Sequence, residues 1–339
     1  MGELAILGAG SWGTALAVLL APQAPWLWEH RPDRAAALQR QRENARYLPG
    51  VSLPGSVQVT HDLATAARAS AALVIAVPSH AVRPLARRLA ALPLPPQQIV
   101  VNAAKGLELE TGKRLLEVLG EELPHSAPLV VSLVGPSHAE EVARGMPTTV
   151  VVAGSDESAL RRVQDLFSTE TFRVYTNTDA VGVELAVALK NVIAIAAGVM
   201  DGLGFGDNSR GALLTRGLAE MTRLGVALGA RPETFAGLAG LGDLVTTATS
   251  RHSRNRNLGE AIGRGTSLAT ALAAIGQVAE GVGTTRAALQ LARAHGVEMP
   301  ITAQVHDILF EGKDPRLALR DLMLRAPKAE TWSKARGVS

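Results

Sequence analysis

Residues 3–20 join a short apolar strand, a glycine-rich turn and a helical segment, and no other run constrains the fold of this chain as strongly. ELAIL at 3–7 leads directly into Gly8-Ala9-Gly10-Ser11-Trp12-Gly13, which is followed by TALAVLLA. Glycines at these spacings allow a tight turn, and they let a pyrophosphate approach the N-terminus of the following helix. The run predicts a dinucleotide site containing Gly8, Gly10 and Gly13, although such glycines can also serve packing alone.

Apolar, β-branched runs recur at helix-length intervals through the first half of the chain, at 57–60, 71–78, 98–103, 129–135, 148–154 and 172–176. They predict a parallel sheet covered by helices on both faces. After residue 178 the pattern becomes helical as far as 324, with breaks at 202–211, 237–244 and 251–256. We therefore expect a Rossmann-like, doubly wound α/β domain over 1–179, an all-α domain over 180–326 and a flexible tail over 327–339.

The segment PWLWEHRPD bears on which dinucleotide binds. Glu29 lies about 20 residues past the first glycine, where an acid would bind the ribose hydroxyls of NAD. His30 and Arg31 follow directly and could accept the 2′-phosphate of NADP, although Arg31 could equally be a solvated turn residue. We expect NADPH to be preferred and NADH to be tolerated.

The segment 181–200 is apolar on every helical face, which is typical of a buried helix. Lys190 and Asn191 lie inside it. Burial lowers the pKa of a lysine and suits it to proton transfer near neutral pH; alternatively, the side chain could snorkel to water. Because these two polar residues interrupt the run and no basic flank follows, we expect no membrane insertion.

Polar residues follow three of the predicted strands, at 77–79, 105–108 and 135–140, where open α/β sheets bind ligands. Each also has a simpler interpretation: Ser137 and Glu140 fit a helix capping box, and Lys105 could be a surface lysine. The run 246–256 gathers hydroxyls, an amide and several cations, which suits either a phosphate site or a solvated loop. Asp243, just before it, could cap a helix or bind a substrate hydroxyl.

The amino-acid composition indicates which kinds of ligand and partner the protein can bind. The chain has no cysteine, and its eight histidines lack zinc-ligand spacing, so we expect no metal site. Its net charge of +3 comes from scattered basic residues and its aromatic content is 3%, which favours a small anion over nucleic acid. The N-terminus reads as a strand without a leader, so we expect a cytoplasmic protein.

Together these segments resemble the bacterial-type NAD(P)-dependent sn-glycerol-3-phosphate dehydrogenases. The resemblance spans about residues 3–310 and is carried by GAGSWGTALA, NARYLP, VPS, AAKGLE, GPSHAEE, ELAVALKNVIAIAAGVMDGLGFGDNSRGALLTRGLAEM, GLAGLGDLVTTATS, SRNRNLG, VAEGVGTT and MPI. It implies reduction of dihydroxyacetone phosphate for lipid synthesis, with NADPH/NADP or NADH/NAD as cofactor, by a homodimer. The alternatives are a related β-hydroxyacid or sugar-acid phosphate dehydrogenase and a non-catalytic dinucleotide sensor.

The resemblance also implies residue roles. Lys190 would be the proton donor and acceptor, assisted by Asn191, Lys105 and Asp243. Cofactor contacts would come from Gly8, Gly10, Ser11, Trp12, Gly13, His30, Arg31, Lys105, Ala139, Arg254, Val278 and Glu280. Substrate contacts would come from Lys105, Gly135, Ser137, Lys190, Asp243, Thr247, Ser253, Arg254 and Asn255. Three positions depart from the family pattern: Glu29, Ala45 in NARYLP, and His138 in GPSHAEE.

Overall fold

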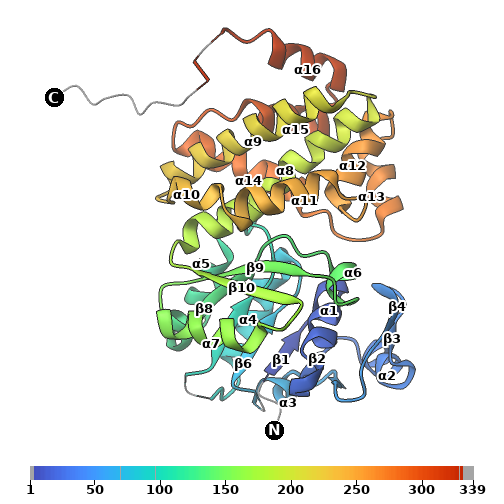
Figure 1. The fold of residues 1–339 in the computed structure, drawn as a ribbon, viewed down its shortest axis with the longest axis vertical. Helices are drawn as coiled ribbons and strands as arrows, with labels where there is room; N and C mark the ends of the chain where they lie inside the picture. The colour runs from blue at the N-terminus through green and yellow to red at the C-terminus, as the bar shows by residue number, and fades with distance from the viewer. Residues whose placement is uncertain (1–3, 69, 96, 328, 331–339) are drawn as a thin grey trace, which may run out of the picture.

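The computed structural model describes residues 4–68, 70–95, 97–327 and 329–330. Most of the tail predicted at 327–339 therefore lies outside the described residues. An eight-stranded sheet forms the N-terminal half, in the order β10-β9-β8-β7-β6-β1-β2-β5 (Figure 1). Its strands are β1 (Leu4–Leu7), β2 (Trp26–Trp28), β5 (Gln58–Thr60), β6 (Ala72–Ile75), β7 (Ile99–Asn102), β8 (Val130–Val134), β9 (Thr148–Ala153) and β10 (Phe172–Asn177). All the predicted strands are present. The inner strands are buried between two helical layers, whereas β5 and β10, at the two edges, are partly exposed.

The sheet is mixed, so the prediction of a wholly parallel sheet is wrong at one edge. It holds from β8 to β5, but β9 pairs antiparallel with β8, with Val134 opposite Val151, and β10 runs parallel to β9. A parallel crossover normally contains a full helix. The connection from Val134 to Thr148 contains only the one-turn helix α6 (Ala139–Val142), so the chain returns in the opposite direction.

Helices cover both faces of the sheet, as a doubly wound fold requires. One buried cluster joins the sheet to α1 (Ser11–Leu19) and α7 (Glu157–Phe167). A second cluster joins the opposite face to α3 (Leu63–Arg68), α4 (Val82–Ala90) and α5 (Leu115–Glu122). The helix α2 (Pro32–Gln41) follows β2, and a hairpin of β3 (Glu43–Asn44) and β4 (Leu48–Ser52), which we did not predict, follows α2.

The second half of the described chain is helical, as predicted, and surrounds α8 (Ala180–Gly202) (Figure 1). The other elements are α9 (Asp207–Ala227), α10 (Pro232–Phe235), a short π-helix η4 (Leu238–Gly242), α11 (Asp243–Thr249), α12 (Arg254–Gly263), α13 (Leu268–Ile275), α14 (Glu280–Ala294), α15 (Pro300–Phe310) and α16 (Pro315–Met323). The predicted breaks are shorter than expected, because α9 begins at Asp207, η4 occupies 238–242 and α12 begins at Arg254.

The helix α8 is the central packing element of this half. In the part of the chain that the structure describes it is the one helix long and apolar enough to cross a membrane, yet 94% of its most apolar window is buried inside the protein. It contacts α12 backbone to backbone: a Cβ on Gly198 would lie 1.9 Å from the Arg256 carbonyl oxygen, and one on Gly259 would lie 2.0 Å from that of Ile195. Glycine is required at both positions, and this contact fixes α12 against α8.

Candidate active site

A cavity of about 790 Å³ lies between the sheet and the helical half, and it brings together most of the predicted site residues. Those that line it are Gly8, Gly10, Ser11, Trp12, His30, Lys105, Ser137, Ala139, Lys190, Asn191, Asp243, Thr247, Ser253, Arg254, Asn255, Val278 and Glu280. Three predicted residues are not part of this lining. Gly13 packs behind the glycine turn, the Gly135 carbonyl accepts a hydrogen bond from Lys105 at 2.6 Å, and Arg31 pairs with Asp33.

The glycine-rich turn has the shape that a dinucleotide pyrophosphate needs. Gly8 has φ +122°, and a Cβ there would lie 2.7 Å from the Ala76 carbonyl oxygen, so only glycine fits. A Cβ on Gly13 would lie 1.8 Å from the Gly8 carbonyl oxygen, whereas one on Gly10 would meet nothing within 4 Å. The open side at Gly10 therefore leaves room for a ligand beside the N-terminus of α1, whose N–H groups suit an anion.

The hairpin β3–β4 closes one side of this turn. The Asn44 amide nitrogen donates to the Ala9 carbonyl at 2.9 Å and to the Thr14 hydroxyl at 2.7 Å. The Ser11 hydroxyl donates to the Tyr47 carbonyl at 2.6 Å. NARYLP is thus placed beside GAGSWG, which explains why both segments belong to one site.

Two lysines meet one carboxylate at the other end of the cavity. Lys190 Nζ lies 3.0 Å from Asp243 Oδ1, and Lys105 Nζ lies 3.0 Å from Asp243 Oδ2. Lys190 also donates to the Thr247 hydroxyl. The Lys190 side chain is 6% exposed, which rules out the snorkelling interpretation.

Burial lowers the pKa of Lys190 to about 8, against the opposing charge of Asp243, and the positive charge of Lys105 lowers it further. Burial of Asp243 opposes its ionisation, but the charges of Lys105 and Lys190 outweigh burial and hold its pKa below the ordinary value. The cluster therefore holds a stable carboxylate beside an ammonium that can release its proton near neutral pH.

The helices α8 and α12 are joined by amides next to this cluster. Asn255 Nδ2 donates to Asn191 Oδ1 at 2.9 Å, and Asn255 Oδ1 accepts from the Gly281 N–H at 3.0 Å. The Ser253 hydroxyl caps α12 by accepting from the Arg256 N–H. Arg254, the first residue of α12, is exposed within the cavity. This arrangement places cationic and amide groups at the lysine end of the cavity.

Glu280 connects the two halves of the molecule. Its carboxylate accepts from the Ser79 N–H at 3.0 Å and from the Ser79 hydroxyl at 2.6 Å. Ser79 follows β6, whereas Glu280 opens α14. The segment VPS is thus held against VAEGVGTT across the cavity.

The structure excludes two of the simpler, helix-capping interpretations. Ser137 and Glu140 form no capping box: the N-cap of α6 is His138, with no side-chain cap, and the Ser137 hydroxyl donates to the Gly135 carbonyl at 3.0 Å. Asp243 does not cap the following helix, because it is already the first residue of α11 and its carboxylate contacts the two lysines.

Several cavity residues were not predicted from the sequence, among them Trp28, Arg34, Tyr47, His80, Arg88, His138, His252 and Gln277. Tyr47 lies in NARYLP and His138 lies in GPSHAEE, so the family motifs could have identified both as site residues. Arg34 and Arg88 lie in helical segments that carry no motif. The His138 and His252 rings lie 5.8 Å apart. Burial and the nearby Lys105 and Lys190 lower the pKa of His138, so it is neutral near pH 7.

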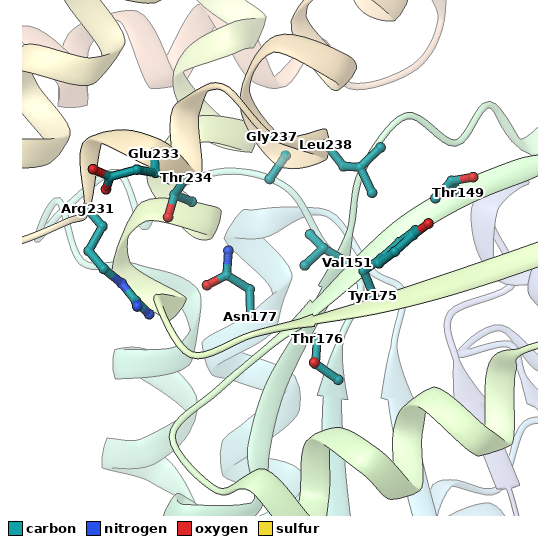
Figure 2. A pocket seen from close by; sticks show the side chains of 11 residues that line it. Thr149, Val151, Tyr175, Thr176, Asn177, Arg231, Glu233, Thr234, Gly237 and Leu238 are labelled. Atoms are coloured by element: carbon teal, nitrogen blue, oxygen red, sulfur yellow. The ribbon is translucent and has the colours of Figure 1, made fainter.

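A second cavity of about 790 Å³ lies between β9, β10 and the segment 231–239 (Figure 2). Figure 2 shows Tyr175, Thr176 and Asn177 of β10 opposite Glu233 and Thr234 of α10. Its lining contains no predicted site residue and none of the glycines of the GAGSWG turn, so we place the active site in the first cavity. Within the described ranges, no three histidine, aspartate or glutamate side chains are grouped as a metal site requires.

The doubly wound sheet with its glycine turn, and the buried lysine at the far end of the same cavity, define a dinucleotide-dependent dehydrogenase. Two family models match the chain: "NAD-dependent glycerol-3-phosphate dehydrogenase N-terminus" over residues 3–160 and the corresponding C-terminus over 179–320. The chain belongs to the NAD-dependent glycerol-3-phosphate dehydrogenase family, as its motifs predicted.

Its similarity to individual members extends over nearly the whole length. A glycerol-3-phosphate dehydrogenase (NAD(P)+) of Moorella thermoacetica is 56% identical over 98% of this chain and 98% of its own. One from Chlorobium limicola is 53% identical over 97% of this chain and all of its own. The crystal structure of glycerol-3-phosphate dehydrogenase from Coxiella burnetii has a TM-score of 0.90 at 41% identity, covering 95% of this chain and 98% of that chain.

Proposed function

We propose that this enzyme reduces dihydroxyacetone phosphate to sn-glycerol 3-phosphate, reversibly, with NADH or NADPH. The observation that carries the proposal is the Lys105–Asp243–Lys190 cluster, which lies in the same cavity as the glycine turn. Relatives more than 50% identical, named glycerol-3-phosphate dehydrogenase (NAD(P)+), support it.

Lys190 carries the proton in this proposal. When bound, the nicotinamide supplies hydride to C2 of the substrate, or accepts it in the reverse direction. Protonated Lys190 gives its proton to the alkoxide oxygen as that oxygen becomes basic, and neutral Lys190 takes the proton back during oxidation. A pKa of about 8 keeps both forms of Lys190 accessible near neutral pH.

Asp243 and Lys105 set the conditions for this transfer. Asp243 favours the protonated form of Lys190, while Lys105 opposes it and holds Asp243 from the other side. Lys105 also lies where it can orient the substrate oxygen. We assign Lys105 and Asp243 to substrate orientation as well as to control of Lys190.

The phosphate of the substrate is proposed to bind at the N-terminus of α12. Arg254 offers a planar pair of donors, and Ser253, Asn255 and Thr247 line the same end of the cavity. Binding energy from the phosphate would position the carbonyl next to Lys190. Ser137 lines this end on the sheet side, and Gly135 contributes through its carbonyl, which accepts a hydrogen bond from Lys105.

The proposed division of labour follows the two halves of the fold. We assign cofactor binding to residues 1–179, with Ser11, Trp12, His30 and Ala139 as contacts and with Val278 and Glu280 returning from the helical half. We assign proton transfer and most of substrate binding to residues 180–326, with Lys105 and Ser137 contributing to substrate binding from the sheet half. We further propose a cytoplasmic homodimer that contacts its partner through the helical half and supplies glycerol phosphate for phospholipids; sedimentation velocity tests the dimer.

The testing experiment is NADPH and NADH oxidation with dihydroxyacetone phosphate, compared between the wild type, Lys190→Ala and Lys113→Ala. Lys113 is an exposed lysine paired with Glu121, so it controls for loss of a lysine as such. We expect Lys190→Ala to lose about a hundredfold to ten-thousandfold in kcat, the scale of general acid catalysis, while Lys113→Ala stays near wild type.

Three outcomes would contradict the proposal. Equal activity of Lys190→Ala and wild type would remove Lys190 from proton transfer. A wild type that turns over a β-hydroxyacid or sugar-acid phosphate but not dihydroxyacetone phosphate would reassign the substrate. Intact dinucleotide binding with no turnover of any substrate in the panel would favour a sensor.

A further inference from the structure

Two arginines extend the cavity past the end of β2, away from the lysine cluster. Arg34 lies in the first turn of α2, and Arg88 lies near the end of α4. Both line the cavity together with Trp28, His30 and Tyr47. Among the residues that the structure describes, neither arginine has a carboxylate within ion-pair distance, so both cations can bind an external anion.

Arg34 is linked to the glycine-rich turn through Tyr47. Its Nη1 lies 3.4 Å from the Tyr47 hydroxyl, and the Tyr47 carbonyl accepts the Ser11 hydroxyl at 2.6 Å. Ser11 begins α1, where the pyrophosphate would bind. Arg34 is therefore on the side of the cavity that the cofactor would follow from the pyrophosphate towards its adenosine end.

Arg88 enters the cavity from the opposite face of the sheet, because α4 packs on one face and α2 on the other. Its guanidinium lies 5.2 Å from the ring centroid of Trp28, a cation–π contact that positions the side chain. The Trp28 ring is itself fixed by a hydrogen bond from Nε1 to the His61 carbonyl at 3.0 Å. Arg87, the preceding residue on α4, instead pairs with Glu122 at 3.2 Å and is not part of the cavity lining.

Arg31, which the sequence favoured as the phosphate ligand, is engaged elsewhere. Its Nε and Nη2 donate to the two oxygens of Asp33 at 3.1 and 2.9 Å. Glu29 is also occupied, because its Oε1 accepts from the Arg31 N–H at 3.1 Å and lies 3.0 Å from His30 Nδ1. A 2′-phosphate next to this buried carboxylate needs compensating cations, and Arg34 and Arg88 are the arginines placed to supply them.

We propose that Arg34 and Arg88 bind the 2′-phosphate of NADPH from two sides of β2 and so determine the preference for NADPH over NADH. The inference rests on the proposed function for the identity of the cofactor. Arg34 and Arg88 act here as specificity residues and take no part in proton transfer. His30 completes the site from the end of β2.

The test is calorimetric titration of the protein, without substrate, with NADP+ and NAD+. The variants are Arg34→Ala and Arg88→Ala, with Arg40→Ala and Arg87→Ala as matched controls, because these arginines lie in the same two helices and do not line the cavity. Arg31→Ala tests the alternative phosphate ligand. Loss of one charge-assisted contact in Arg34→Ala or Arg88→Ala should raise the dissociation constant of NADP+ about tenfold to a hundredfold. The dissociation constant of NAD+ should change by less than about threefold. The two controls should leave both dissociation constants within about threefold of wild type.

Arg34→Lys and Arg88→Lys separate charge from geometry. They retain a cation but lose the planar pair of donors, and we expect a smaller loss for NADP+ than in the alanine variants. Unchanged NAD+ binding in each variant also shows that the fold is intact.

The proposal is overturned if NAD+ and NADP+ weaken equally in Arg34→Ala and Arg88→Ala. It is also overturned if wild type binds the two nucleotides alike, or if Arg31→Ala alone reproduces the loss. Turnover of dihydroxyacetone phosphate with NADPH and with NADH is measured in parallel. If turnover fails with both cofactors while selective NADP+ binding depends on the two arginines, the proposed function is wrong and this inference stands.

Discussion

Replacing Gly259 with alanine tests whether the backbone contact between α8 and α12 sets the geometry of the site. A Cβ at Gly259 would lie 2.0 Å from the Ile195 carbonyl oxygen and 2.8 Å from the Val199 nitrogen. Real Cβ contacts are essentially never below 3.0 Å, so α12 must move by about 1 Å. Both contacted atoms belong to helix backbone, which cannot rotate out of the way.

Gly259→Ala should lower both the stability of the protein and its activity. Overpacking of this kind costs about 1–3 kcal/mol, offset in part by the roughly 0.5–1 kcal/mol that alanine gains over glycine in a helix. We therefore expect a loss of about 1–2 kcal/mol, which lowers Tm by about 1–2 °C per kcal/mol in a chain of this size. Because Arg254 and Asn255 open α12, a 1 Å displacement should also lower kcat/KM for dihydroxyacetone phosphate about a hundredfold.

The matched control is Gly211→Ala in α9. Gly211 lies within a helix, and a Cβ there would meet nothing within 4 Å. This variant should be more stable than wild type by roughly 0.5–1 kcal/mol, with unchanged activity. Scanning calorimetry and steady-state kinetics measure both variants. If Gly259→Ala keeps its Tm and its kcat/KM, the α8–α12 contact does not position the substrate site.

Three further variants probe single charges. Asp243→Asn removes the charge that favours protonated Lys190, an effect of about 1 to 3 in pKa, so the high-pH limb of the reduction should move from about 8 to about 5–7; an unmoved limb would show that Asp243 does not act on Lys190. Arg254→Ala should raise KM for dihydroxyacetone phosphate at least tenfold with a smaller effect on KM for the dinucleotide, and an unchanged substrate KM would remove Arg254 from the phosphate site. Burial raises the pKa of Glu220 to about 7, above its ordinary 4.5, so the protein should lose about 3 kcal/mol of stability as the pH rises from 4.5 to 7. Glu220→Gln should flatten that pH dependence in urea denaturation, and an unchanged slope would assign it to other groups.

Much of the sheet was predictable because burial on both faces selects β-branched runs, such as ALVI of β6 and VVSLV of β8. Strand direction was not, since an apolar run has the same composition whichever way it points. The antiparallel pairing of β9 with β8 follows from a connection that holds one helical turn, and nothing in the strand itself records it.

The site residues that lie in sequence motifs could be predicted from the sequence. Contacts that form only when distant segments pack together could not. Lys190 was identified because a lysine inside an all-apolar helix is unusual. The simultaneous contact of Asp243 with Lys105 and Lys190 joins three segments of the chain. Lys105 and Asp243 are 138 positions apart, so no local sequence pattern could predict this contact.

Arg31 and Arg88, at the cofactor end of the cavity, also show that tertiary contacts were not predictable from the sequence. The sequence indicated Arg31 as a ligand for the 2′-phosphate because it directly follows Glu29 and His30. In the structure its guanidinium forms an ion pair with Asp33. Arg88 reaches the cavity only because α4 packs beside Trp28.

The most direct test of Lys190 as the single proton donor and acceptor is the pH dependence of kcat measured in both directions. We expect the reduction of dihydroxyacetone phosphate to fall as the pH rises through about 8 and the oxidation of glycerol 3-phosphate to rise through the same value, because one group must be protonated for the first and neutral for the second. Profiles that share no pKa near 8, or that change in the same direction, would contradict the account.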